Sequence, residues 1–78
     1  MAGIPGPDDG ILRRMESLGS VRGQKRWGSR CRTTGRLFTW DSLHRETEVY
    51  NKRGWHLGVM DPQGRFIKMA VKGRKIDV

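Results

Sequence analysis

Apolar and polar residues alternate with a period of two along the second half of the chain, from Arg36 onward. Such alternation is typical of strands that bury one face of a sheet, and clusters of Gly, Pro, Asn and Asp between the runs indicate turns. We therefore expect turns at residues 51–54 and 61–64, the second with Pro62 and Gly64 at the favoured positions of a β-turn. The expected strands are residues 37–41, 44–50, 55–60 and 66–71, and residues 74–78 can add a short fifth.

The first third of the chain has a different pattern, in which apolar residues recur at helical spacing. These residues are Ile11, Leu12, Met15 and Leu18. We predict a short helix over residues 10–18 that Gly19 ends. The expected fold class is α+β, a small twisted antiparallel sheet of four to five strands with a short N-terminal helix. We divide the chain into a lead-in with this helix at 1–22 and one domain at 23–78.

Charge adds the strongest indication of function. The chain carries 16 Lys and Arg against 8 Asp and Glu, a net charge of +8, which indicates a polyanionic partner. No acidic residue lies between Glu16 and Asp41, and we expect the basic stretch 20–35 within this segment to lie on the surface. Arg and Trp suit phosphate contacts and base stacking in RNA. The residues expected to contact RNA are Arg26, Trp27, Arg30, Arg32, Arg36, Arg45, Lys72 and Lys75.

Other features of the sequence exclude several classes of protein. The basic stretch is too rich in Gly, Ser and Thr to form the amphipathic helix of a membrane-surface protein, so we expect no membrane binding by this domain. Cys31 is the only cysteine, which rules out an intrachain disulfide. Its spacing to the two histidines matches no recognisable zinc site, and we expect neither a metal nor a cofactor.

One short stretch concentrates groups that can carry out chemistry. With a two-residue turn after the first strand, Asp41 and His44 are expected directly opposite each other on one face of the sheet. Side chains two residues apart in a strand share a face, so Glu46, Glu48 and Tyr50 are expected on the face of His44. One imidazole and three carboxylates thus converge in a strongly basic chain, and this clustering calls for a functional reason.

Cleavage of RNA through its own 2′-hydroxyl would use these groups. The hydroxyl must lose a proton as it attacks the adjacent phosphate, and the leaving 5′-oxygen must gain one; a carboxylate and a histidine can take these roles in either order. An arginine within reach stabilises the phosphorane, and no metal is required. A simpler interpretation is that Glu46 and Glu48 form cross-strand salt bridges. His56 fits a structural role or an RNA contact better than catalysis.

These residues also resemble a known family. Residues 40–50 read Trp-Asp-Ser-Leu-His-Arg-Glu-Thr-Glu-Val-Tyr, and His-Leu-Gly at 56–58, Asp-Pro at 61–62 and a basic tail follow. The run is similar to the Trp-Asp-Ser-x-His-x-Glu-x-Glu-x-Tyr, His-Leu-Gly and Asp-Pro elements of the cytotoxic domain of the ribosome-cleaving colicins and cloacin. The resemblance covers residues 25–78, and several elements in a fixed order are far more specific than one short motif.

The resemblance implies a specific function. Members of this family are endoribonucleases that cut 16S ribosomal RNA once, in the decoding centre of the small (30S) subunit of the 70S ribosome, and so inhibit translation. Their catalytic Asp, His and second Glu match Asp41, His44 and Glu48. The intervening acid matches Glu46, with an orienting or electrostatic role, and the essential Arg of the basic tail matches Arg74.

The same resemblance implies partners and a location. The toxin is accompanied by an acidic immunity protein that blocks it in the producing cell. The domain is expected to be secreted or delivered from the cell surface as part of a larger toxin, either a bacteriocin or a contact-dependent inhibition protein. It would act in the cytoplasm of the target bacterium.

Alternatives stay open because the chain departs from the family pattern. Arg45 replaces the small residue that family members usually place after the His, and the tail before Arg74 lacks the family's Pro-Asp-Pro. A nuclease toxin acting on transfer RNA or DNA would share the same basic surface. So would a non-catalytic RNA- or ribosome-binding module, although a mere binder gains nothing from carboxylates that face phosphate.

Overall fold

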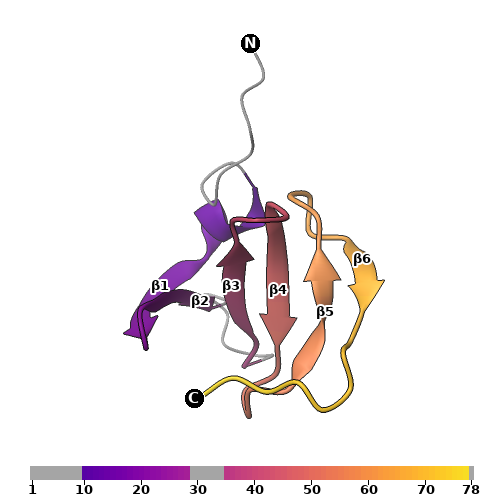
Figure 1. Ribbon diagram of the computed structural model, residues 1–78. Helices are drawn as coiled ribbons and strands as arrows, with labels where there is room; N and C mark the ends of the chain where they lie inside the picture. Colours follow the sequence, from indigo (N-terminus) through magenta and orange to yellow (C-terminus); the bar gives the residue numbers. More distant parts are fainter. Residues whose placement is uncertain (1–9, 29–34, 78) are drawn as a thin grey trace.

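The computed structural model describes residues 10–28 and 35–77, and within them the chain forms one antiparallel sheet of six strands in the order of the sequence. Figure 1 shows the β1–β2 hairpin at an angle to the other four strands, which stand side by side. A short 3₁₀-helix, Ile11–Arg14, precedes the sheet. The strands are β1 (Glu16–Val21), β2 (Gln24–Gly28), β3 (Leu37–Asp41), β4 (Glu46–Tyr50), β5 (His56–Met60) and β6 (Phe66–Met69).

The predicted helix over residues 10–18 is wrong beyond its first turn, and the described fold is mostly β rather than α+β. Met15 has an extended backbone with ψ of 156°, and β1 begins at the next residue. The helical spacing misled because Leu12 and its apolar neighbours reach the core from a single turn, whereas Leu18 lies half-exposed on β1. Pairing with β2 outweighs the weak helix preference of a segment containing Ser and Gly.

The first hairpin was missed entirely by the sequence pattern. Val21 pairs with Gln24, so the turn consists of Arg22 and Gly23 alone. Both residues have positive φ, 52° and 80°, as two-residue hairpin turns of type I′ require. Part of the stretch 20–35 is therefore paired strand, and the sheet has six strands instead of four to five.

The antiparallel strands expected from residue 37 onward are confirmed, with shorter ends. β3 has the predicted bounds, and the turns at 51–54 and 61–64 are present, each closed by a backbone hydrogen bond of 2.9 Å. The segment 74–78 adds no strand within the described residues, only a bridge between Trp55 and Lys75. The turn after β3 is four residues long, so Asp41 pairs with Glu46 and not with His44.

The two faces of the sheet have different compositions. One face is covered by the 3₁₀-helix and holds the apolar core, which consists of Leu12, Trp27, Phe38, Val49 and Met60. The opposite face carries the polar side chains of β3 and β4 that alternate with the core residues. No helix among the described residues is long and apolar enough to cross a membrane.

The C-terminal tail completes the polar face. After β6 the chain turns back beneath the sheet, as Figure 1 shows. The amide of His56 donates to the carbonyl of Arg74 at 3.0 Å, and the amide of Ile76 donates to the carbonyl of Gly54 at 2.9 Å. Asp77 then forms an exposed ion pair with Arg22 at 2.7 Å. These contacts fix the backbone of Arg74 beside the start of β5.

Candidate active site

A histidine and an aspartate form the first half of the site, at the turn between β3 and β4. Asp41 Oδ1 accepts hydrogen bonds from the amides of Leu43 at 3.0 Å and His44 at 3.2 Å. Asp41 Oδ2 lies 2.8 Å from His44 Nδ1. The contact predicted between these two side chains is therefore present, although it arises inside the turn and not across two paired strands.

The carboxylate of Asp41 fixes which nitrogen of His44 is left for other partners. The hydrogen bond from the His44 ring holds the pKa of Asp41 below its usual value and outweighs the opposing effect of desolvation. An ionised carboxylate only accepts, so Nδ1 of the ring must donate. Nε2 is then left to the solvent-facing side of a ring that is 57% exposed. His44 can exchange a proton through this atom.

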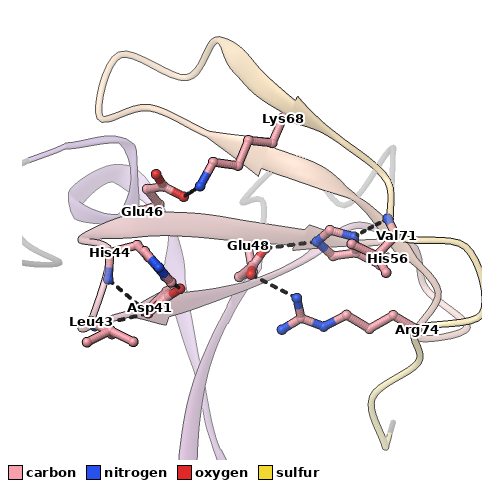
Figure 2. Close-up of polar contacts among 9 residues, drawn as sticks. All are labelled: Asp41, Leu43, His44, Glu46, Glu48, His56, Lys68, Val71 and Arg74. Atoms are coloured by element: carbon pink, nitrogen blue, oxygen red, sulfur yellow. Dashed lines mark hydrogen bonds and ion pairs between the residues drawn. The ribbon is translucent and has the colours of Figure 1, made fainter.

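Glu48 is the centre of the second half of the site. It lies on β4, and its side chain is 9% exposed. Oε2 is 2.8 Å from Nε2 of His56, and Oε1 accepts a hydrogen bond from Nη1 of Arg74 at 3.0 Å. Figure 2 shows both contacts converging on this one carboxylate.

Arg74 reaches this site from the C-terminal tail, as the resemblance implied. Its guanidinium lies 5.9 Å from the centre of the Tyr50 ring, and its side chain is 44% exposed. Tyr50 itself is fully buried, and burial raises the pKa of its phenol despite the opposing charge of Arg74. The guanidinium is therefore held by the Glu48 carboxylate and the Tyr50 ring, while its exposed side remains open to a phosphate from solvent.

Glu46 occupies a separate position on the same face. Its Oε2 is 3.0 Å from Nζ of Lys68 on β6. The salt bridge considered as the simple interpretation is thus realised for Glu46, although Lys68 lies on β6, which β5 separates from β4. Glu48 also has a basic partner, Arg74, but its carboxylate binds a buried histidine as well.

These groups line one pocket of about 260 Å³ on the polar face. It is bounded by Asp41, His44, Glu46, Glu48, His56, Val59, Lys68, Met69, Val71 and Arg74. All five residues predicted to be catalytic are therefore brought together. No group of three His, Cys, Asp or Glu side chains suited to a metal ion is found in residues 10–28 and 35–77.

His56 and Lys68 were not predicted as members of the site. A four-residue turn at 51–54 would place Trp55 opposite Tyr50, and His56 would then face the core. A bulge between Val49 and Tyr50 shifts the register, so His56 is the residue that pairs with Tyr50. The side chain of His56 is 0% exposed, which excludes the direct RNA contact considered for it.

The residues predicted to bind RNA separate into four groups. Trp27 belongs to the core and Arg26 is also buried, each 6% exposed, so these two side chains do not lie on the surface as expected. Arg30 and Arg32 lie outside the described residues. Arg45, Lys72 and Lys75 are exposed, and Lys75 lies 5.3 Å from the centre of the Trp55 ring. Arg36 is partly buried against the ring of Phe66.

Comparison with known proteins identifies the family of this chain. A family model described as Cytotoxic matches residues 10–77, which include the six strands, the tail and every residue that lines the pocket. Neither a curated protein nor a solved structure gave a match. The chain therefore belongs to the Cytotoxic family, in agreement with its resemblance to the cytotoxic domain of the colicins and cloacin.

Proposed function

We propose that this chain is the endoribonuclease domain of a bacterial toxin, which cleaves 16S ribosomal RNA in the decoding centre of the small subunit. The observation that carries this proposal is the pocket in which His44, Glu48 and Arg74 meet. It combines a proton donor, a proton acceptor and a fixed cation within a chain of net charge +8. These are the components that cleavage of RNA through its 2′-hydroxyl requires.

The proposed reaction transfers the phosphoryl group from the 5′-oxygen to the 2′-oxygen. The 2′-hydroxyl gives its proton to Glu48 and forms a bond to phosphorus, and the bond from phosphorus to the 5′-oxygen breaks as His44 gives a proton to that oxygen. The products are a 2′,3′-cyclic phosphate and a free 5′-hydroxyl. Arg74 binds the phosphoryl oxygens, whose negative charge grows in the phosphorane.

The hydrogen bonds of the site support this order of proton transfer. Glu48 accepts at both oxygens, and each carboxylate oxygen retains a further lone pair that can take a proton. His44 keeps Nε2 free because Asp41 engages Nδ1. Glu46 forms an ion pair with Lys68 and contributes negative charge to the pocket.

The same proposal includes a partner and a route. A nuclease of this kind must be neutralised in the cell that makes it, and a surface of charge +8 favours rapid association with an acidic immunity protein. We place the chain in a larger toxin that is secreted or delivered from the cell surface and acts in the cytoplasm of the target bacterium. Exposed basic side chains such as Arg45, Lys72 and Lys75 would contact the ribosomal RNA.

The test is a comparison of substrates. The purified chain is incubated separately with intact 70S ribosomes, with transfer RNA and with DNA, and every new RNA or DNA end is mapped. The proposal predicts one cut in 16S RNA of the ribosome and none in the other substrates at the same concentration. Cleavage of transfer RNA or DNA in preference to ribosomes would identify another nuclease toxin. Binding to ribosomes with no cut in any substrate would leave a non-catalytic module.

A further inference from the structure

His56 makes four contacts in the interior of the site that the proposed chemistry does not use. Its ring joins Glu48 through Nε2 and the amide of Val71 through Nδ1, both at 2.8 Å. Its own amide donates to the carbonyl of Arg74 at 3.0 Å. The ring also meets the ring of Tyr50 edge-on, with 5.2 Å between the centres. Both ring nitrogens and the amide of this buried histidine are therefore engaged.

The contact with Val71 determines the protonation of this ring. A backbone amide can only donate, so Nδ1 must accept and carries no proton. The single ring proton is then on Nε2, from which it is donated to Glu48. His56 is thus held as one neutral tautomer, and both of its nitrogens are occupied. It has no free atom with which to exchange a proton with RNA.

The contacts of His56 also close a ring of interactions around Glu48. Val71 and Arg74 are the two ends of a tight turn, in which the amide of Arg74 donates to the carbonyl of Val71 at 3.1 Å. His56 holds the first end through its side chain and the second through its main chain. Arg74 returns to Glu48 at Oε1, opposite the oxygen that His56 binds. The carboxylate is therefore fixed from two sides by parts of one connected network (Figure 2).

We propose that His56 is the positioning residue of the site, which fixes the rotation of the Glu48 carboxylate for proton abstraction, with the Val71 amide holding it in the donating tautomer. This inference rests on the proposed function, because it assigns Glu48 an orientation needed for RNA cleavage. Positioning matters because a displacement of about 1 Å at a reacting group can lower a rate by about 100-fold. Without the donor at Nε2, Glu48 would keep Arg74 as its partner and turn toward it.

Two substitutions separate the two nitrogens of His56. In His56→Asn the side-chain oxygen can stand near the position of Nδ1 and accept from Val71, but no donor reaches Glu48. In His56→Gln the side-chain amide extends to the position of Nε2 and can donate to Glu48, whereas the acceptor for Val71 is lost. Each variant thus keeps one of the two ring contacts and is the matched control for the other.

The test is single-turnover cleavage of 16S RNA in intact ribosomes over a range of enzyme concentrations, alongside urea unfolding of each variant. We expect His56→Asn to lower the maximal rate by about 100-fold with unchanged half-saturation, and His56→Gln to recover at least about tenfold of that loss. A role confined to folding predicts instead that rates follow stability and that half-saturation changes as well. His56→Asn cleaving as fast as His56→Gln would overturn the positioning role.

A measurement that does not depend on activity accompanies this test. A long-range ¹H–¹⁵N spectrum of the wild-type chain at neutral pH reports which ring nitrogen of His56 carries the proton. The inference predicts the Nε2–H tautomer, and a proton on Nδ1 would contradict it. If the wild-type chain fails to cut ribosomal RNA at all, the proposed function fails and the positioning role fails with it. If it cuts and His56→Asn cuts equally well, only the inference about His56 is lost.

Discussion

The site contains two histidine–carboxylate pairs with the same separation and opposite surroundings. At the β3–β4 turn His44 lies 2.8 Å from Asp41, and its side chain is 57% exposed. At the start of β5 His56 lies 2.8 Å from Glu48, and its side chain is 0% exposed. The first pair uses one ring nitrogen and leaves the other free, whereas the second pair uses both.

This difference shows that the role of each residue follows from its surroundings and not from its type. In the proposed mechanism, the carboxylate of the exposed pair orients and its histidine meets the substrate. In the buried pair the histidine orients and the carboxylate meets the substrate. A residue can take part in proton transfer only if one of its atoms can still give or take a proton in the pocket. Nε2 of His44 is unengaged and both oxygens of Glu48 keep a lone pair, whereas both ring nitrogens of His56 are occupied. The predictions below test this assignment, from the largest expected effect to the smallest.

Removal of the exposed histidine should have the largest effect on activity. His44→Ala should lower the rate of RNA cleavage by about 10³-fold, because general acid catalysis is lost. The free energy of unfolding should fall only by the small contribution of the hydrogen bond to Asp41, since the side chain is mostly exposed. Single-turnover cleavage and urea unfolding measure the two quantities. Leu43→Ala is the matched control at the same turn, where Leu43 is 79% exposed. Near wild-type cleavage by His44→Ala would remove His44 from the mechanism.

Loss of the cation that binds the buried Glu48 should affect both activity and stability. Arg74→Ala should slow cleavage by about 100-fold, because the phosphorane loses its cation. It should also reduce the free energy of unfolding by about 1–3 kcal/mol, since Oε1 of the buried Glu48 loses its donor. The control is Arg53→Ala, which removes the same charge from the exposed turn at 51–54 without touching Glu48. Equal effects of the two substitutions would mean that only net charge matters.

The exposed pair should make stability depend on pH. In the folded chain the hydrogen bond from His44 holds the pKa of Asp41 below its usual 3.8. At pH values around and just below 3.8 the folded state therefore binds fewer protons than the unfolded state, so ionised Asp41 stabilises the fold above pH 3.8. That contribution is lost as the pH falls through the lowered pKa. The excess stability of wild type over Asp41→Asn should be full near neutral pH and should shrink below pH 3.8. Urea unfolding across this range measures it, and a constant difference would argue against the His44 contact.

The backbone of the exposed turn should give the smallest effect. Arg45 has a φ of 54°, a conformation that favours glycine, and it stands where the colicin family places a small residue. Arg45→Gly should raise the free energy of unfolding by up to about 1 kcal/mol through relief of this strain. Arg45→Ala, which removes the charge but retains a side chain at positive φ, should bring no such gain. A loss of stability in Arg45→Gly would show that the turn does not strain this residue.

The alternation of residues predicted the region from β3 onward, because its strands bury one face and are separated by strong turn signals. It also predicted that Asp41, His44 and Glu48 would lie close together, although His44 lies inside a four-residue turn and not on a strand opposite Asp41. The β1–β2 hairpin was missed because Arg22 and Gly23 are a less distinctive turn than Asn-Gly, and because Leu18 extends a helical spacing by coincidence.

The remaining site residues depend on long-range register, which sequence alone does not define. The bulge between Val49 and Tyr50 moves His56 onto the polar face. A second irregularity, between Val59 and Met60, shifts the register of β5 and β6, so that Val59 pairs with Lys68. Gly58, which pairs with Val49 at the edge of this register shift, is a residue type that can mark a bulge, but a single Gly does not define the new pairing. Arg74 was located only through the family resemblance, because its position depends on the path of the tail after β6.

The central claim is that the pocket cleaves RNA by attack of the 2′-hydroxyl, with Glu48 and His44 as the acid–base groups. The most direct measurement is the chemistry of the new RNA ends after incubation of ribosomes with the chain, with and without a chelator of divalent metals. The account predicts a 2′,3′-cyclic phosphate and a 5′-hydroxyl, formed equally well in the presence of the chelator. A 3′-hydroxyl with a 5′-phosphate would contradict it, as would cleavage that the chelator abolishes while the ribosomes remain intact.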